Sequence, residues 1–252
     1  MPFSEPIRLE RFLAGAGLCS RRAARVLIAA GEVSVNGQPA VLGTKVSGDA
    51  DRVEVQGRRV QSRQPRVTLA MHKPRGLLCS NSDPHHARTV FSELPPPWSG
   101  HRFFCAGRLD KESEGLLILT TDGDLAQRLT HPSHRVVKRY RVVLDREYPR
   151  TQLARLLHGV IVEGERFQVE HASLVHPRPG GGASELDVHL HHGKKREIRR
   201  LFLALGYHVR RLRRYQIGAL CLPGLPAGAV KPLTEAEVRL LFRTAPTPAH
   251  PS

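Results

Sequence analysis

Two apolar segments flank Asp110 and suggest that this carboxylate is placed for chemistry. The runs at residues 103–105 and 116–119 each have the composition of a short buried strand, with glycines at the boundaries. Reactive side chains often lie in loops held by rigid strands. On spacing alone, an aspartate in such a turn more often accepts backbone N–H bonds and has no chemical role. Asp110 is therefore the first candidate for chemistry, with a structural role as the alternative.

The residues around Asp110 also form a longer pattern. Residues 108–117 read Arg-Leu-Asp-x-x-Ser-x-Gly-Leu-Leu and are followed by Leu-Thr-Thr-Asp-Gly at 119–123. This string closely resembles the active-site signature of the RsuA-like family of bacterial ribosomal RNA pseudouridine synthases, and the resemblance extends from about residue 7 to residue 243. It implies that the chain isomerises a specific uridine of ribosomal RNA to pseudouridine, with Asp110 as the reactive carboxylate and without a cofactor.

The implied reaction explains which groups such a site needs. It breaks the bond between uracil N1 and the ribose, turns the base over and joins a ring carbon to the same ribose carbon. An ionised carboxylate, a surface for the detached ring and a means of extracting the nucleotide are required. The sequence is compatible with attack of Asp110 on the base, attack on the sugar, or removal of a ribose proton.

The resemblance also assigns catalytic roles to Tyr140 and Arg199. The Lys-Arg-Tyr sequence that ends at Tyr140 resembles the family's Lys-x-Tyr, whose ring stacks on the target uracil, an interaction of ~1–3 kcal/mol. Residues 193–201 resemble the family's last motif, in which Arg199 is the guanidinium that keeps the carboxylate of Asp110 ionised in a dry pocket. Both assignments depend on the motif, because a lone Tyr on a strand is more often core and an Arg in a basic segment more often contacts phosphate.

Further residues are expected to bind the substrate. Arg108 resembles the arginine that fills the space left in the RNA when the nucleotide is extruded; without the motif it would be an ordinary surface arginine. Glu197 stands where many family members carry glutamine, although glutamate occurs in the branch that acts on the large subunit. A pocket-wall residue and basic side chains complete the expected set: Ile198, Lys138, Lys73, Arg200, Arg21, Arg22 and Arg25.

The charge of the chain indicates a polyanionic partner. The formal net charge is +16, and residues 193–214 alone contain nine basic residues and one acid, which gives +8. Apolar residues at helical spacing run through this segment, so the charge lies on a folded element, as a surface that follows RNA phosphates requires. Arg196, Arg213 and Arg214 are expected to be such phosphate contacts.

Residues 7–59 form an expected RNA-binding module. Ser20 can cap a helix that ends at Gly31, and Asn-Gly at 36–37 predicts a two-residue hairpin. The order of two helices and a compact strand unit resembles the alpha-L RNA-binding domain of a small-subunit ribosomal protein. The helix is expected to present one apolar face made of Ala23, Val26, Leu27 and Ala30.

The rest of the chain is expected to be a catalytic domain over residues 67–243, after a linker at 60–66 and before a disordered tail at 244–252. Its irregular order of strands and helices predicts an α+β fold with a mixed, largely antiparallel sheet. Specific expectations are a helix at 195–205, a hairpin loop at 180–182 and a capping box at 234–237.

Other features set the expected environment and partners. The sequence has neither an apolar run of 18 residues nor a secretory signal, which predicts a cytoplasmic protein. The four cysteines form no C-x-x-C pair and are expected to be reduced and mostly core, and the histidines lack metal-ligand spacing. We therefore expect no metal and no cofactor, no membrane partner, and a monomer that acts on ribosomal RNA or pre-ribosomal particles.

Three other functions are compatible with parts of this pattern. A non-catalytic RNA-binding ribosome-assembly factor would have the same charge, but it has no need for Asp110, Tyr140 and Arg199 together. A metal-dependent nuclease would need several clustered carboxylates. A synthase for small-subunit ribosomal RNA is the third alternative. The sequence around 196–201 and Gly206 favours large-subunit ribosomal RNA near the peptidyl-transferase region as the target.

Overall fold

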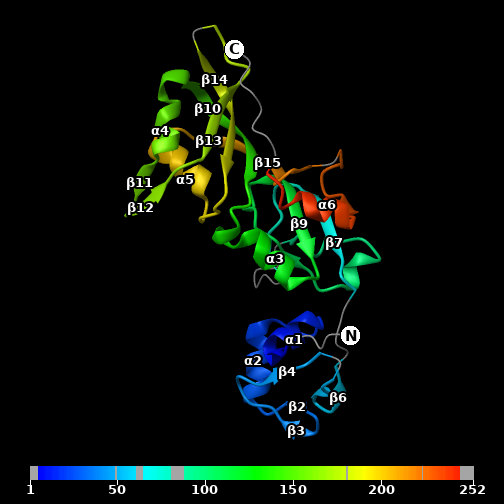
Figure 1. Ribbon diagram of the computed structural model, residues 1–252. Coiled ribbons are helices and arrows are strands. Elements are labelled where there is room, and N and C mark those ends of the chain that lie inside the picture. The colour runs from blue at the N-terminus through cyan, green and yellow to red at the C-terminus, as the bar shows by residue number, and fades with distance from the viewer. Residues whose placement is uncertain are drawn as a thin grey trace. The chain divides into compact units, whose positions relative to one another are not determined.

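The chain divides into two compact units (Figure 1). One consists of residues 1–67 with 121–123, and the larger one consists of residues 68–120 with 124–252. Residues 61–64 of the expected linker, Gly180 of the expected hairpin loop and residues 245–252 of the expected tail lie outside the described residues. The computed structural model describes residues 5–48, 50–60, 65–80, 88–179, 181–222 and 224–244.

The N-terminal unit packs two helices against short strands. Strands β1 and β4 pair with each other, and β3-β2-β5-β6 form an antiparallel sheet with the expected Asn-Gly turn between β2 and β3. Its core consists of apolar residues from α1, α2, β2, β4 and β5. The elements are β1 (Ile7–Arg8), α1 (Leu9–Gly15), α2 (Arg21–Ala29), β2 (Val33–Val35), β3 (Gln38–Pro39), β4 (Lys45–Val46), β5 (Val53–Val55) and β6 (Arg58–Arg59).

Helix α2 begins and ends where the sequence predicts, but it buries a different face. The Ser20 hydroxyl accepts the N–H of Ala23 at 3.1 Å, and Gly31 follows the helix with a φ of +74°. The buried residues are Ala24 and Ile28. The expected face was wrong because a spacing of four residues places these two over α1 and the sheet, whereas Ala23 and Ala30 are exposed and Val26 is 68% exposed.

The larger unit is built on one nine-stranded sheet. Its strand order is β13-β14-β10-β15-β9-β7-β17, with β16 paired to β15 and β8 paired to β9. Only the β15–β9 pair is parallel among the described strands, which confirms the mixed, largely antiparallel sheet. The strands are β7 (Thr68–Lys73), β8 (Phe104–Cys105), β9 (Glu114–Thr120), β10 (Lys138–Pro149), β11 (Val160–Val162), β12 (Glu165–Phe167), β13 (His171–Val175), β14 (Gly182–Leu190), β15 (Val209–Ile217), β16 (Leu220–Cys221) and β17 (Val230–Pro232).

The parallel β9–β15 pair requires a glycine. Gly115 pairs with Arg214 at a φ of +109°, and a Cβ atom there would overlap the carbonyl oxygen of Arg214. The absence of a side chain therefore lets β15 approach the strand that follows Asp110. This approach places the basic β15 beside the Asp110 loop.

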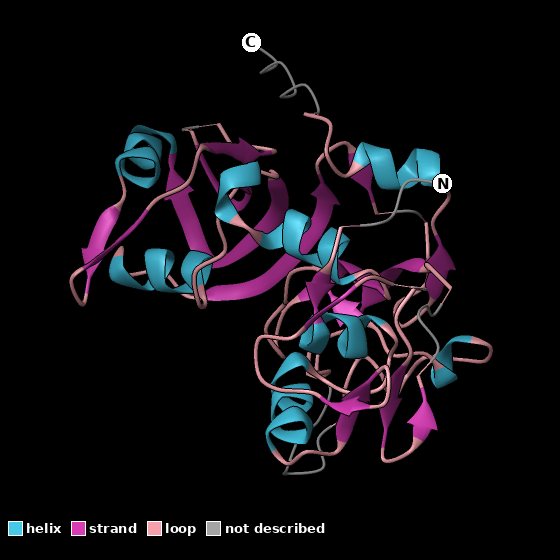
Figure 2. Ribbon diagram, turned by 60° about the horizontal axis from the view of Figure 1, so that its bottom comes forward, coloured by secondary structure: helices cyan, strands magenta, loops and turns pink. Residues whose placement is uncertain are grey.

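Short helices lie against this sheet beside its long, curved strands (Figure 2). One core cluster joins β10, β14 and β15 to α4 and α5, and a second joins β7 and β9 to α3 and α6. Helix α5 begins at Glu197, two residues later than expected, because Arg196 is left-handed. The capping box of Thr234 and Glu237 is confirmed at α6. The helices are α3 (Gly123–Thr130), α4 (Leu153–His158), α5 (Glu197–Ala204) and α6 (Glu235–Leu240).

Candidate active site

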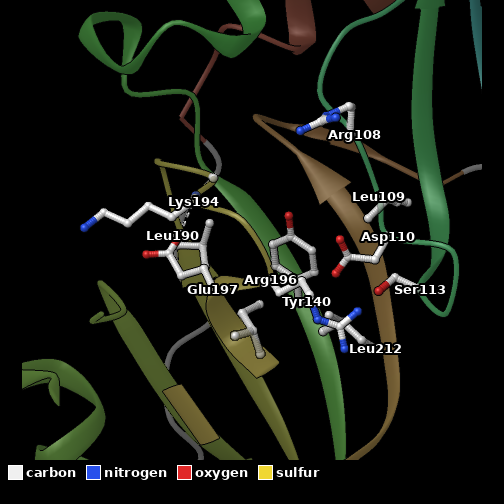
Figure 3. Close-up of a pocket in the computed structure, with 12 residues that line it drawn as sticks. Arg108, Leu109, Asp110, Ser113, Tyr140, Leu190, Lys194, Arg196, Glu197 and Leu212 are labelled. Atoms are coloured by element: carbon white, nitrogen blue, oxygen red, sulfur yellow. Dashed lines mark hydrogen bonds between the residues drawn. The ribbon is translucent and has the colours of Figure 1, made fainter. Parts of the chain in front are cut away.

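A pocket in the larger unit brings together residues far apart in the sequence (Figure 3). One wall comes from the loop between β8 and β9, and the other comes from β10, the end of β14, the turn before α5, and β15. Polar groups and apolar side chains alternate around it. The lining residues are Arg108, Leu109, Asp110, Ser113, Tyr140, Leu190, Gly193, Lys194, Arg196, Glu197, Ile198 and Leu212.

The carboxylate of Asp110 faces the ring of Tyr140 across this pocket (Figure 3). Asp110 is half-buried, while Tyr140 is only 7% exposed and packs among the apolar side chains of its strand. Figure 3 shows the Tyr140 hydroxyl on the same side of the pocket as the exposed Arg108. Ile198, which is also buried, contributes to the wall. Four of the expected site residues therefore meet in one place.

Lys73 fixes the loop that carries Asp110. Its side chain is fully buried, and its ammonium donates to the carbonyls of Ser113 at 2.8 Å, Pro74 at 3.0 Å, Asp110 at 3.2 Å and Lys111 at 3.4 Å. Burial is the largest cause of its lowered pKa. The expectation that Lys73 contacts substrate was wrong, because its three N–H groups are directed to the protein's own carbonyls.

Lys138 differs from the expectation in the same way. It is 6% exposed, and its ammonium donates to the carbonyls of Val136 at 3.0 Å and His191 at 3.1 Å. Burial, followed by the nearby charge of Arg214, lowers its pKa to about 8. Lys138 thus ties β10 to the chain after β14 and is not presented to a ligand.

Arg199 anchors the Asp110 loop through its backbone. The guanidinium donates to the carbonyl of Val209 at 3.0 Å, to that of Glu112 at 3.1 Å and to the hydroxyl of Ser113 at 3.5 Å. Burial lowers its pKa most, Arg196 lowers it further, and the charge of Asp110 opposes the change. The expected ion pair of Arg199 with Asp110 is absent from the described part of the chain. Arg199 contributes charge near Asp110 without direct contact.

Arg200 is held outside the pocket. Its guanidinium lies 2.6 Å from the carboxylate of Glu163 and 3.5 Å from that of Glu165, and it covers the ring of Phe167 at 4.4 Å. In the N-terminal unit, Arg21, Arg22 and Arg25 of α2 are all exposed. We call these three the α2 arginines. Their exposure is compatible with phosphate contact, as the sequence predicts.

Arg214 is a buried residue and not a surface phosphate contact. It is 1% exposed; its Nε donates to the carbonyl of Leu116 at 2.7 Å, and its Nη1 lies 3.5 Å from the hydroxyl of Tyr140. The expectation for Arg214 was wrong because charge was counted without strand alternation. Leu212 and Arg214 are two residues apart on β15 and share its inner face, which the apolar Leu212 could have indicated.

The turn before α5 adds Arg196, which the sequence assigned to phosphate contact, and is followed by the motif residue Glu197. Arg196 lies at φ 53° and ψ 31°, lines the pocket and extends past Tyr140 to the side that holds Asp110 (Figure 3). The buried carboxylate of Glu197 accepts the N–H of Lys194 at 3.0 Å and lies 2.7 Å from Nδ1 of His192. A left-handed non-glycine residue costs ~1–2 kcal/mol, and such strain is concentrated at functional sites. The late start of the apolar helix pattern at Ile198 is the sequence signal for this turn.

Metal ligation has no visible centre among the described residues. The described residues contain no group of three or more His, Cys, Asp or Glu side chains placed to hold a metal ion. His189 and His191 each lie beside a carboxylate, and the adjacent histidines His85 and His86 lie outside the described residues. The four cysteines are free; Cys19, Cys79 and Cys105 are partly buried and Cys221 is exposed, so the expectation that they are mostly core was wrong. No helix of the described chain is long and apolar enough to cross a membrane.

Comparisons with known proteins agree with this geometry. Residues 67–204 match the family model described as RNA pseudouridylate synthase, and residues 7–53 match the S4 domain. An uncharacterised RNA pseudouridine synthase of Mycobacterium leprae is 38% identical over 94% of this chain and 93% of its own. Ribosomal large subunit pseudouridine synthase B of Bacillus subtilis is 35% identical over 93% of this chain and 95% of its own. A crystal structure of a pseudouridylate synthase superposes with a TM-score of 0.66 at 28% identity and covers 93% of this chain and 99% of that one.

Proposed function

The chain belongs to the RNA pseudouridine synthase family and carries an S4 domain before the synthase part. We propose that it isomerises a specific uridine of large-subunit ribosomal RNA. Two relatives named ribosomal large subunit pseudouridine synthase B, which are 35% and 38% identical to this chain, support large-subunit RNA as the substrate. The arrangement that carries the proposal is the Asp110 carboxylate facing the Tyr140 ring in one pocket.

Each pocket group has a task in this reaction. The electron pair of the C1′–N1 bond leaves with N1, C1′ then bonds to C5, and C5 loses a hydrogen while N1 gains one, so the product is an isomer. Asp110 is the group proposed to start this exchange, by attack or by proton removal. Tyr140 offers a buried aromatic face for the uracil ring, an interaction of ~1–3 kcal/mol, which offsets much of the cost of flipping. Arg108 is exposed at the same pocket and is proposed to fill the space left in the RNA.

The buried cations are proposed to keep the site in its reactive shape. Lys73 and Arg199 together hold the backbone carbonyls of residues 110–113, so the Asp110 loop is fixed from both sides. Side chains that react must be held within a fraction of an ångström, and charged donors to carbonyls give such rigidity.

The setting of the reaction is also a proposal. The α2 arginines and those basic residues of segment 193–214 that are neither buried nor in the pocket, such as Arg213, are expected to bind RNA phosphates, which would raise the concentration of the target uridine at the pocket. We propose a cytoplasmic monomer that takes ribosomal RNA or a pre-ribosomal particle as substrate.

Mapping of pseudouridines in ribosomal RNA tests the target. Cells without the gene should lack one or more pseudouridines in large-subunit RNA, and the wild-type gene should restore them. D110N should fail to restore them. The matched control E112Q changes a carboxylate of the same loop whose side chain contacts exposed Arg75 at 3.2 Å, and it should restore them. Pseudouridines lost only from small-subunit RNA would contradict the proposed target.

A further inference from the structure

The turn before α5 presents Arg196 to the pocket in a fixed but strained conformation. Arg196 is left-handed, and the carboxylate of the next residue, Glu197, is buried and accepts the N–H of Lys194. Glycine or asparagine would take this conformation more easily. Because backbone strain is concentrated at functional sites, an arginine in this conformation at a pocket wall is a candidate for a functional role.

The guanidinium of Arg196 is available for a ligand. In the described part of the chain, its neighbour Arg199 is held by two carbonyls and a hydroxyl, and Arg200 is held by two carboxylates. No such acceptor holds Arg196 among the described residues, and it is exposed and lines the pocket. It also lies near enough to Arg199 to lower that residue's pKa. Two neighbouring guanidinium groups favour an electron-rich acceptor between or beside them.

The pocket suggests which acceptor fits. Apolar or aromatic surfaces of Tyr140, Leu190, Ile198 and Leu212 suit the faces of a flat ring, whereas Asp110, Ser113 and Arg196 are polar (Figure 3). A uracil ring held by its faces presents O2 and O4 at its edge. Attack on the base places negative charge on O4, and attack on the sugar or removal of a ribose proton releases a uracil anion with charge on O2 and O4, in each case before C1′ bonds to C5.

We propose that Arg196 binds a carbonyl oxygen of the flipped uracil and stabilises the negative charge that the ring carries while C1′ is detached from N1. This proposal rests on the proposed function. Arg196 is then a catalytic residue of the pocket and not one of the phosphate contacts of the basic segment. Preorganised donors aimed at developing charge are among the largest contributions to catalysis.

Two substitutions separate the side chain from the turn. R196N keeps a residue that accepts the left-handed conformation and removes the guanidinium, so the fold should be retained. We expect it to lower the single-turnover rate about 100-fold. R196K keeps a charge without the planar fork and should recover part of this loss. R155A, which removes one positive charge from exposed Arg155 on α4, is the matched control and should keep the wild-type rate.

The substrate provides the second half of the test. RNA with 4-thiouridine or 2-thiouridine at the target replaces one ring oxygen with sulfur, a weaker acceptor. One of the two should slow the wild-type enzyme, and the same replacement should have little further effect on R196N. The slope of log affinity against log salt should be equal for wild type and R196N.

The outcomes are distinct. Wild-type turnover of unmodified RNA tests the proposed function independently of the variant. If the wild type turns over and R196N matches its rate, Arg196 has no catalytic role. If R196N instead lowers the salt slope by ~0.7–0.9 and keeps its rate at saturating RNA, Arg196 contacts a phosphate and the proposal is overturned.

Discussion

The buried ammonium of Lys138 should make the stability of the larger unit rise with pH. Lys138 is 6% exposed, and burial together with Arg214 lowers its pKa from 10.5 to about 8, against the opposing charges of Glu170 and Glu197. Below pH 8 both the folded and the unfolded chain hold this proton. Between pH 8 and about 10.5 the unfolded chain still holds it, whereas the folded chain has released it.

The size of the effect follows from this difference in pKa. At ~1.36 kcal/mol for each pH unit, the free energy of unfolding should gain about 3 kcal/mol between pH 8 and 10.5. K138M removes the titrating group and so removes this gain. It also leaves the carbonyls of Val136 and His191 without the ammonium, at a cost that does not depend on pH. The difference in stability between wild type and K138M should therefore grow by about 3 kcal/mol over this range.

Urea unfolding at pH values from 7 to 10.5 measures this difference in stability between wild type and K138M. The chain has one tryptophan, Trp98, and it lies in the larger unit, so its fluorescence reports that unit. K111M, which removes an exposed lysine from the Asp110 loop, is the control and should differ from wild type by a constant amount. If the wild-type minus K138M difference stays flat or shrinks with pH, Lys138 is not a buried, titrating ammonium and the reasoning fails.

Three more changes test the packing and the charged surfaces. G115A should destabilise the larger unit by about 3 kcal/mol or more in urea unfolding, because its Cβ would overlap the Arg214 carbonyl at a positive φ; wild-type stability would refute the close strand approach. R213A should lower the slope of log affinity against log salt by ~0.7–0.9. R214A should leave that slope unchanged and should instead lower the free energy of unfolding by ~1–3 kcal/mol, because Arg214 is buried. Equal slopes and stabilities for the two variants would contradict the different burial of these arginines. Replacing all three α2 arginines with alanine should lower the slope by up to ~2–3 and keep the single-turnover rate at saturating RNA; an unchanged slope would remove the N-terminal unit from RNA binding.

The sequence predicts the frame of the fold well where local signals are strong. The Ser20 cap, the Asn-Gly hairpin and the Thr234 capping box each depend on a few adjacent residues, and the structure contains all three. The α+β class, the mixed sheet and the family are confirmed as well. The prediction of the buried face of α2 was wrong because the buried face depends on which elements pack against the helix. The sequence of the helix itself does not contain this information.

Charge was the least reliable guide to the site. Asp110, Tyr140, Arg108 and Ile198 were identified through three family motifs, and they do line one pocket. Basic residues were divided into phosphate and pocket contacts without knowledge of burial. Lys73 and Lys138 are enclosed by carbonyls from distant segments, and such partners are set by tertiary contacts.

Arg196 was wrongly assigned in the opposite direction, to the RNA backbone instead of the pocket. It was assigned to the RNA backbone because it lies in a basic run, but a left-handed turn directs it into the pocket. The Glu197 carboxylate closes this turn by accepting the N–H of Lys194. A residue type alone does not reveal such a conformation.

Release of tritium from ribosomal RNA labelled at uracil C5 tests the central claim most directly, because only formation of the C1′–C5 bond in the proposed reaction frees that hydrogen. Purified wild-type protein should release tritium from large-subunit RNA, E112Q should release it at a similar rate, and D110N should release none while it binds the RNA with nearly unchanged affinity. Appreciable release by D110N would contradict the role of Asp110, and no release by the wild type would contradict the proposed reaction on this RNA.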